Sequence, residues 1–417
     1  MFPPLDEIPP SAIVRNANKH AVLDLIRFRS GGISRVEMAQ GLGMTRAAIS
    51  MIVNDLLSIG IVREAEQRSL RNGGRPARIL EINPEYGKVI GIDLGASHVT
   101  LLIANAAAHA LYEREEALDI TAGPVVVLEQ VNSLIQTSLK ECGISWDTIL
   151  AVGVGVPGPI DAHSGSVISP PIMPGWHGYP IRATLEERWK RPVSLNNDAE
   201  LGAVGEWAFG AGRGERFLAY IKVGTGVGAG LLLDGKIYRG ATGSAGEIGH
   251  ITIDENGPEC TCGNYGCVEA YAGGRAIARI AREAVQKGMR TQLASLPLEK
   301  ITALEVANAA RRGDFLAQQI IARAGEHLGI AIAGVVNLFN PTTIIIGGGV
   351  AQIGDLYLDP LRKTVQKRSL PASARAVRIT TALLGRRSSA LGAVVQAISL
   401  ALHQVIQKEK TAEVEMA

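Results

Sequence analysis

Three cysteines and one histidine lie close enough together in this chain to constrain both its fold and its chemistry. The four residues are His250, Cys260, Cys262 and Cys267. Zinc in proteins takes four nitrogen or sulfur ligands in a tetrahedron, and Gly263 and Gly266 give the backbone the freedom that such a tight wrap needs. The alternative is a set of ordinary buried cysteines. We favour a structural zinc site, which would leave Glu247 and Glu269 free to bind another molecule.

The length and charge of the chain limit the classes of protein to which it can belong. At 417 residues it is too long for one compact core, and we expect two or three domains. The net charge of +2 creates no overall field that would draw the protein to nucleic acid or membrane. The charge is uneven, because residues 1–82 contain 11 Lys and Arg against 8 Asp and Glu, and the remainder contains 31 against 32. The amino-terminal part is therefore mildly basic.

The cysteines and the apolar segments predict a cytoplasmic protein. Four cysteines, three of them in one cluster, do not make a disulfide framework, which favours a reducing compartment. Residues 1–10 lack the basic and apolar parts of a signal peptide. Residues 330–354 are uncharged, but glycines and an Asn-Pro pair interrupt them well short of a membrane span and predict a buried helix, a turn and a core strand. We therefore expect neither export by that route nor a membrane partner.

Residues 33–57 have helical periodicity interrupted by a short glycine turn, which is the pattern of a helix-turn-helix. Ala39 is a small residue where two helices would touch, Gly43 lies in the turn, and Thr45 is a suitable N-cap for the second helix. The leading face of that helix would meet base edges in the major groove of DNA. The residues predicted on this face are Thr45, Arg46, Ala47 and Ser50. An ordinary helical hairpin is the alternative.

Two short strands are predicted after the second helix, at residues 61–66 and 77–82, and a basic, glycine-containing tip joins them. This arrangement indicates a β-hairpin wing. Arg71 and Arg75 on the tip suit contacts with phosphate groups and with a narrow, negative minor groove. Together with a preceding helix, these elements predict that residues 12–82 form a winged helix-turn-helix that binds DNA.

Three glycine-rich loops follow β-rich runs in the rest of the chain, at residues 93–97, 223–230 and 347–349. Small residues in such loops allow backbone amides to approach phosphate groups. A GxGxxG match at residues 153–158 is a false lead, because Pro157 prevents the helix that a dinucleotide fingerprint must open.

These features resemble the ROK family, which contains repressors, open reading frames and sugar kinases. The cysteine–histidine cluster is the most specific part of the likeness, and the glycine loops and the Asn197-Asp198 pair extend it over nearly the whole chain. The resemblance implies that zinc orients a histidine that touches both metal and sugar. The sugar-binding residues that it implies are Asn197, Asp198, Glu247, His250 and Glu269. It makes Asp198 the general base if the protein is a kinase.

The resemblance also implies a nucleotide site, although the chain departs from the kinase pattern there. The phosphate-loop residues that it implies are Asp93, Gly95, Ser97, Gly224, Thr225 and Gly226. Ala96 stands where the kinases usually have a second glycine, His98 stands where they have a basic residue, and Glu200 replaces a residue that is commonly asparagine. We therefore expect structural zinc and bound sugar, whereas binding of ATP and magnesium is doubtful.

The fold class that these parts and the family resemblance imply is α/β. A winged helix-turn-helix would precede a two-lobed body of the actin-like, sugar-kinase (RNase H-like) type. The first lobe is expected over residues 88–195 and the second, with the zinc site, over residues 196–387. A last helix over residues 388–405 would pack back on the first lobe, and residues 406–417 would form a loose tail.

Two functions agree with this pattern. The favoured one is a sugar-responsive transcriptional regulator, a repressor that resembles the xylose-repressor and N-acetylglucosamine-repressor types. It would bind operator DNA as a homodimer or homotetramer and hold a monosaccharide or sugar derivative as its effector. The other is an ATP-dependent sugar kinase with a DNA-binding extension. The sequence does not identify the sugar.

Overall fold

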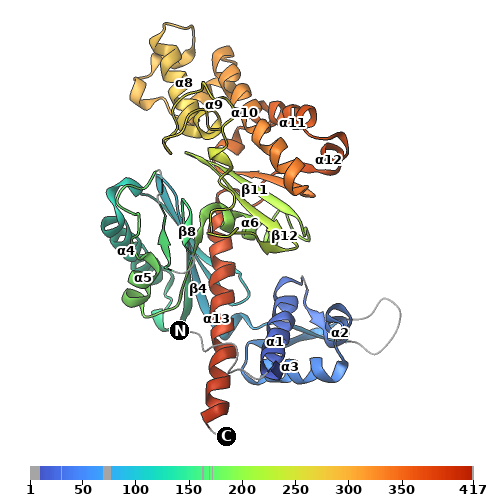
Figure 1. The fold of residues 1–417 in the computed structure, drawn as a ribbon. Helices are drawn as coiled ribbons and strands as arrows, with labels where there is room; N and C mark the ends of the chain where they lie inside the picture. Colours follow the sequence, from blue (N-terminus) through green and yellow to red (C-terminus); the bar gives the residue numbers. More distant parts are fainter. Residues whose placement is uncertain are drawn as a thin grey trace.

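The computed structural model describes residues 10–29, 31–68, 77–161, 164–168, 170 and 172–415. Within these residues the strands form two five-stranded sheets, one three-stranded sheet and one two-stranded ribbon. Figure 1 shows the two large sheets in separate lobes, with the long helix α13 (Ser388–Glu415) running beside the first sheet and past the N-terminal helices. The fold is mixed α/β, as predicted.

The N-terminal segment, residues 10–82, contains three helices packed on a small antiparallel sheet with strand order β1-β3-β2. Its elements are α1 (Pro10–Phe28), β1 (Ile33–Ser34), α2 (Arg35–Leu42), α3 (Arg46–Ser58), β2 (Val62–Arg68) and β3 (Ala77–Ile82). The two strands predicted after the second helix are therefore confirmed. Residues 69–76, which include the predicted DNA contacts Arg71 and Arg75, lie outside the described residues.

Local signals in the sequence set the boundaries of α2 and α3. The Ser34 hydroxyl accepts from the Glu37 amide while the Glu37 carboxylate accepts from the Ser34 amide, which satisfies two amides at the start of α2. Gly43 ends α2 in the left-handed conformation, with φ of 62°. The Thr45 hydroxyl caps α3 by accepting from the Ala48 amide. The predictions for Gly43 and Thr45 are confirmed.

The first lobe is built on a sheet with strand order β10-β7-β4-β5-β6. Its elements are β4 (Lys88–Leu94), β5 (His98–Asn105), β6 (Ala110–Ala117), α4 (Pro124–Cys142), β7 (Ile149–Val156), β8 (Ile160–Asp161), β9 (Ser166–Val167), α5 (Ile181–Trp189) and β10 (Val193–Asn197). Strands β4 and β5 form an antiparallel hairpin around the glycine-rich loop at residues 93–97. Strands β4, β7 and β10 are parallel, so Asp93 near the end of β4 and Asn197 at the end of β10 lie at one edge of the sheet.

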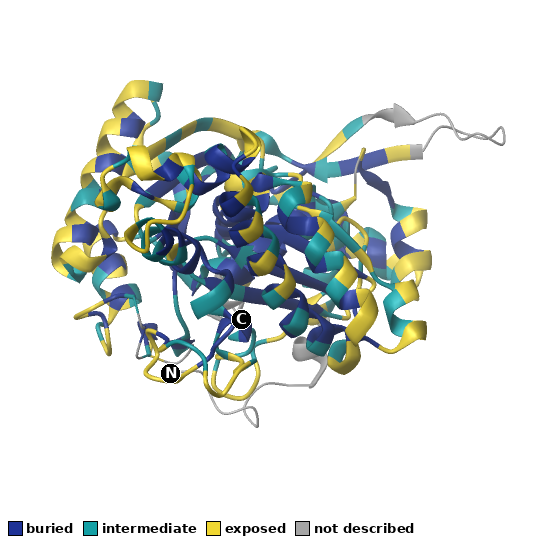
Figure 2. Ribbon diagram, turned by 90° about the horizontal axis from the view of Figure 1, so that it is seen from above, coloured by how far each residue is buried: buried dark blue, intermediate teal, exposed yellow. Residues whose placement is uncertain are grey.

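The second lobe is built on a sheet with strand order β13-β12-β11-β14-β15. Its strands are β11 (Leu218–Val223), β12 (Val227–Leu233), β13 (Lys236–Ile237), β14 (Thr343–Gly347) and β15 (Arg378–Thr381). Its helices are α7 (Glu269–Ala272), α8 (Gly274–Gln286), α9 (Ala303–Arg311), α10 (Phe315–Phe339), α11 (Asp355–Arg368) and α12 (Pro371–Ala376). The end of α10, a left-handed Asn340 and the buried β14 confirm the helix, turn and strand predicted over residues 330–354. Figure 2 shows that buried residues concentrate in the sheets and inner helices.

Helices α6 (Asp198–Phe209) and α13 pack closely on each other, and α13 also lies on β4 and β7 of the first sheet. A Cβ atom on Gly153 of β7 would lie 2.1 Å from the carbonyl oxygen of Ala393 in α13. A Cβ atom on Gly392 of α13 would lie 1.9 Å from the carbonyl oxygen of Leu201 in α6. Because no side chain fits at these distances, the close contact of α13 with both elements requires glycine.

The prediction of a loose tail after residue 405 is wrong, because α13 continues to Glu415. Ile406 is buried in the same apolar cluster as Val22, Leu23 and Ile26 of α1. Residues 385–407 are long and apolar enough to cross a membrane, but 67% of the most apolar window is buried inside the protein. This is the behaviour of a core helix.

The N-terminal segment contacts α13 through α1. Arg27 donates to the Ser399 hydroxyl at 2.8 Å and to the Val395 carbonyl at 3.0 Å. The rings of His20 and His403 meet edge to face, with their centroids 4.1 Å apart. Burial lowers the pKa of both imidazoles below the ordinary value of 6.5. Helix α13 therefore contacts the first lobe and the N-terminal segment at once.

We predict that the contact between α1 and α13 weakens in acid. Because burial lowers both histidine pKa values, the packed rings bind fewer protons than exposed rings do, although Asp24 partly offsets the effect. The stabilisation is therefore complete above pH 6.5 and is lost as the pH falls through the lowered values. Hydrogen exchange of the α1 amides, corrected for intrinsic rates, should accelerate over this range. His403→Phe should reduce the pH dependence because it removes one of the two titrating rings, and equal protection at all pH values in the wild type would contradict the prediction.

Candidate functional site

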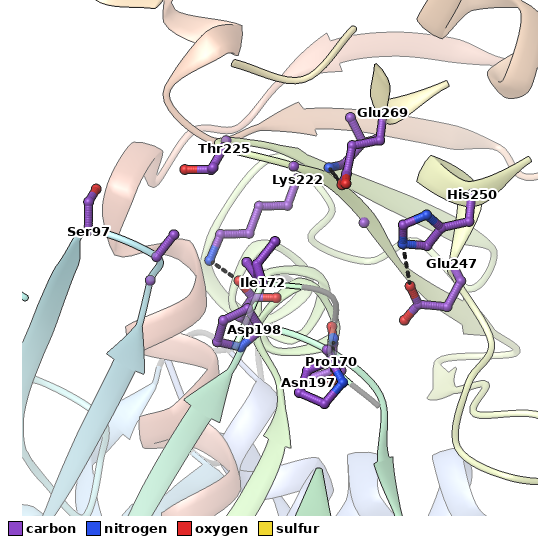
Figure 3. Close-up of a pocket in the computed structure, with 18 of the residues that line it drawn as sticks. Ser97, Pro170, Ile172, Asn197, Asp198, Lys222, Thr225, Glu247, His250 and Glu269 are labelled. Carbon is purple, nitrogen blue, oxygen red and sulfur yellow. Dashed lines mark hydrogen bonds and ion pairs between the residues drawn. The ribbon is translucent and has the colours of Figure 1, made fainter. Parts of the chain in front are cut away.

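The edge of the first sheet and the β11–β12 turn of the second face a common cavity. All five residues of the predicted sugar site line it: Asn197, Asp198, Glu247, His250 and Glu269. Figure 3 shows Glu247 and His250 side by side, with Asp198 and Asn197 across the cavity from them. Strand β10, the starts of helices α6 and α7, and the segment after β13 thus bring distant parts of the sequence together.

The cysteine–histidine cluster has the dimensions of a tetrahedral zinc site. The ligand atoms of His250, Cys260, Cys262 and Cys267 all lie within 4.8 Å of one another. The sulfurs of Cys262 and Cys267 are 3.8 Å apart, and Cys260 Sγ is 3.6 Å from His250 Nδ1. Two sulfurs bound at about 2.3 Å to a tetrahedral ion would lie about 3.8 Å apart, and a sulfur would lie about 3.5 Å from a nitrogen bound at about 2.0 Å. The four residues therefore fit zinc.

Glycine shapes this cluster as predicted. Gly263 and Gly266 have φ of 87° and 65°, in the left-handed region that favours glycine. Burial raises the pKa of the Cys267 thiol to about 12 when no cation is nearby. A bound metal would supply the positive charge that stabilises the thiolates.

A metal on Nδ1 of His250 leaves the other ring nitrogen facing the cavity. His250 Nε2 lies 3.9 Å from Glu247 Oε2, and Figure 3 shows the two side chains pointing toward each other. With Nδ1 bound to zinc, the proton of the neutral ring is on Nε2, which becomes a hydrogen-bond donor. The metal would thus set both the orientation and the tautomer of a cavity-lining imidazole.

The two glutamates differ in their surroundings. Burial, with repulsion from Asp198, Glu269 and Glu200, raises the pKa of Glu247 to about 7. Glu269 is tied to the β11–β12 turn, because its Oε2 accepts from the Val227 amide at 2.8 Å. Each carboxylate retains acceptor capacity toward the cavity. A ligand with several hydroxyl groups would match these acceptors and the donor on His250.

Asn197 and Asp198 have separate roles at the start of α6. Asn197 is the N-cap, and its Oδ1 accepts from the amides of Ala199 and Glu200 at 2.8 and 3.2 Å. Its Nδ2 donates to the Gly158 carbonyl at 3.0 Å. Asn197 therefore caps the helix, whereas the Asp198 side chain lines the cavity.

Lys222 is the cavity residue that sequence reasoning missed. Its Nζ lies 2.9 Å from Asp198 Oδ2 and 3.1 Å from Asp93 Oδ2. Burial alone would lower the pKa of Lys222, but Asp198 and Asp93 raise it above the ordinary value. A lysine within an apolar strand gives no local signal of such a contact, because strand lysines usually face solvent.

The predicted phosphate-loop residues gather at the same place, and in the first loop the His98 ring packs on Gly95. A Cβ atom on Gly95 would lie 2.7 Å from the His98 ring, so the imidazole lies directly against this glycine. Asp93 is 2% exposed and paired with Lys222. Gly226 abuts the Glu269 carboxylate. Ser97, Gly224 and Thr225 line both the first cavity and an adjoining one of about 970 Å³.

Glu200, which departs from the kinase pattern, is a structural residue in this protein. It is 3% exposed, and its Oε2 accepts from Arg239 Nε at 3.1 Å. Arg239 also donates to Asn196 Oδ1 at 3.0 Å. The substitution thus connects α6 to the segment after β13.

The predicted DNA-contact residues of α3 lie away from its packed face. Thr45, Arg46 and Ala47 are exposed, and Ser50 is half-buried. The buried face of the helix carries Ile49, Ile52, Val53 and Leu56. The beginning of α3 is therefore accessible to a partner.

We predict that the purified protein carries one zinc ion per chain and that Cys262→Ser removes most of it. Cys262 is exposed, so serine opens no core cavity, but a hydroxyl is a much poorer zinc ligand than a thiolate. The melting temperature should fall as well, because metal binding contributes about 10–16 kcal/mol in zinc-finger peptides. Metal analysis by mass spectrometry measures the stoichiometry. Cys142→Ser, outside the cluster, should retain zinc, and zinc-free wild-type protein would contradict the assignment.

Comparison with known proteins places this geometry in a family. The ROK family profile matches residues 89–399. The xylose repressor of Caldicellulosiruptor bescii is 32% identical over 388 residues, which cover 93% of this chain and 96% of the repressor. A ROK family transcriptional regulator, described as a homologue of the E. coli MLC protein, has a TM-score of 0.79 at 27% identity and covers 96% of this chain and 99% of its own.

A second solved structure similar to this chain is an enzyme. The ROK family glucokinase from Streptomyces griseus, in complex with glucose and AMPPNP, has a TM-score of 0.67 at 30% identity. It covers 75% of this chain and 99% of its own. Both the regulator and the kinase therefore share the two-lobed body, and this chain belongs to the ROK family.

Proposed function

We propose that this protein is a sugar-responsive transcriptional repressor that binds operator DNA through its N-terminal segment and a monosaccharide or sugar derivative in the cavity. One observation carries the proposal. The ROK regulator aligns with 96% of the chain, whereas the ROK glucokinase aligns with 75%. The chain thus combines the ROK body with additional sequence that the regulator shares.

In this proposal residues 12–82 are a winged helix-turn-helix. The support is the succession of α2, a left-handed turn at Gly43, a capped α3 and the β2–β3 hairpin. Thr45, Arg46, Ala47 and Ser50 at the start of α3 would reach base edges in the major groove. Arg71 and Arg75, which lie between β2 and β3 in the sequence, would contact the DNA backbone or minor groove.

The proposed sugar site uses complementary hydrogen bonds. Sugar hydroxyls can both donate and accept, so the carboxylates of Asp198, Glu247 and Glu269 would accept while His250 Nε2 donates. Zinc on the far side of the imidazole would fix that donor. Asn197, whose amide is engaged in capping, would contribute mainly by placing Asp198.

We propose that α13 couples the sugar site to the N-terminal segment. At its start, Ser389 donates to the Asp198 carbonyl at 2.8 Å and accepts from Lys222 at 3.1 Å. Ten residues later, Ser399 accepts from Arg27 of α1. A sugar that shifts the start of α6 would therefore also displace α13, which contacts the proposed DNA-binding segment. Coupling of this kind is typically about 1–3 kcal/mol.

The proposal includes assembly and location. Two copies related by a two-fold axis would present their α3 helices to successive major grooves about 34 Å apart, so we propose a homodimer or homotetramer. A regulator of operator DNA that keeps three thiolates on zinc would act in a reducing cytoplasm.

The alternative is a sugar kinase, and it is favoured by the likeness to the glucokinase and by the presence of Asp198 and Thr225 in one cavity. Coupled measurement of ADP release with sugar, ATP and magnesium distinguishes the two. Turnover that is lost in Asp198→Asn would establish the kinase.

We predict that Glu247→Gln weakens the sugar response of operator binding. At about pH 8, above the raised Glu247 pKa of about 7, the variant replaces a charged acceptor with a neutral one, and hydrogen bonds to charged groups contribute about 1.5–3 kcal/mol. Operator affinity should be measured with xylose, glucose and N-acetylglucosamine by fluorescence anisotropy. The variant should need a higher sugar concentration for the same effect, with unchanged affinity in the absence of sugar. Glu299→Gln, an exposed site in the second lobe, is the matched control. If no sugar or sugar phosphate changes the operator affinity of the wild-type protein, the proposed regulatory function is contradicted.

We also predict that Arg46→Ala lowers operator affinity by about 1–3 kcal/mol if the side chain contacts a base edge. If it contacts phosphate instead, the loss should be similar for all DNA sequences and the salt dependence should become shallower. Arg290→Ala removes an exposed arginine from the second lobe and should leave binding unchanged. Equal affinity of Arg46→Ala and the wild type would refute a role for this end of α3.

A further inference from the structure

A lysine ammonium lies between two carboxylates that come from different parts of the chain. Lys222 is on β11 of the second sheet, Asp93 is on β4 of the first, and Asp198 begins α6. Lys222 Nζ is 3.1 and 3.4 Å from the two Asp93 oxygens and 2.9 Å from Asp198 Oδ2. It also donates to the Ser389 hydroxyl of α13 at 3.1 Å. Figure 3 shows the lysine side chain reaching from the second sheet toward Asp198.

Each proton of the Lys222 ammonium has an acceptor in this position. It has three protons, and it meets three groups: Asp93, Asp198 and Ser389. The side chains of Lys222, Asp198 and Asp93 are only 18%, 14% and 3% exposed. Two carboxylates this close together and this poorly solvated need a cation beside them. Lys222 supplies that charge from within the chain.

Magnesium does not fit beside this ammonium. It binds carboxylates at about 2.0–2.1 Å, keeps a near-octahedral shell and retains several waters. A dication at Asp93 would occupy the side of the carboxylate that Lys222 already contacts, and the two cations would repel each other. The His98 ring lies against Gly95 in the same loop, where a phosphate would need to approach the backbone. The residues present therefore do not fit a site for the magnesium nucleotide that the kinase members of the fold use.

We propose that Lys222 is a built-in cation that replaces a divalent metal between Asp93 and Asp198 and thereby makes the cavity a receptor for uncharged sugar rather than a site of phosphoryl transfer. The inference rests on the proposed function and deepens it. The ammonium holds Asp198 Oδ2 in an ion pair at 2.9 Å, which opposes transfer of a sugar hydroxyl proton to that oxygen. The same ion pairs join the first sheet, α6 and the second sheet, so Lys222 also fixes the relative position of the lobes.

The test is the effect of magnesium on thermal unfolding of Lys222→Thr, measured with zinc-loaded, full-length protein. The variant leaves Asp93 and Asp198 without their cation, so it should melt below the wild type in metal-free buffer. Magnesium or manganese should then bind the two carboxylates and restore stability. At a metal concentration 100 times the dissociation constant, the folding equilibrium should shift by about 100-fold. The wild type should gain nothing from either metal.

The control is Lys222→Thr combined with Asp93→Asn, which removes a metal ligand and should abolish the rescue. A wild type stabilised as much as Lys222→Thr, or a double variant rescued as well as the single one, would overturn the proposal. If Lys222→Thr does not fold, the proposal is tested by electron paramagnetic resonance. This measures how much manganese the wild type and Asp93→Asn each bind. Manganese retained by the wild type and lost from Asp93→Asn would overturn it, and no difference between them would support it.

The proposed function is tested by a different measurement. If the wild type binds no magnesium and no sugar changes its operator binding, the proposed regulatory function is contradicted. The proposed role of Lys222 then still stands. A wild type that responds to sugar but binds magnesium through Asp93 would contradict the role of Lys222 alone.

Discussion

The close contact of α13 with β4, β7 and α6 is the constraint on which the rest of the structure depends. The helix can lie this near to its neighbours only because Gly153 and Gly392 carry no side chain. The contact places Ser389 against Asp198 and Lys222 at one end of the helix and leaves its other end to receive α1. The cavity and the N-terminal segment thus share one rigid element.

Features with local causes could be predicted from the sequence. Thr45 caps α3, Gly43 ends α2, and Gly263 and Gly266 take left-handed conformations, because each depends on the residue and its immediate neighbours. The cysteine–histidine cluster was also predictable, since three of its four residues lie within a short segment. The acids of the cavity came from the family resemblance, because Asp198 and Glu247 are far apart in sequence and only the fold brings them together.

Features that depend on tertiary contacts were missed. Lys222 lies in an apolar strand, and nothing near it in sequence shows that its ammonium meets Asp93, 129 residues away. The extension of α13 past residue 405 was missed for a related reason. The segment has little apolar periodicity of its own, but Ile406 packs on the cluster formed with α1, and the residues that follow contain neither glycine nor proline.

The straightness of α13 has a mechanical consequence for the proposed regulator. Between Ser389 and His403 the helix rises about 21 Å. It can therefore act as a lever that pivots at the end beside the proposed sugar site. A tilt of about 10° about that end would carry the far end sideways by about 4 Å over this rise. Hydrogen bonds to base edges tolerate far smaller errors of position. A small rearrangement beside Asp198 would therefore suffice to misalign the N-terminal segment of one copy in a dimer with its half of the operator.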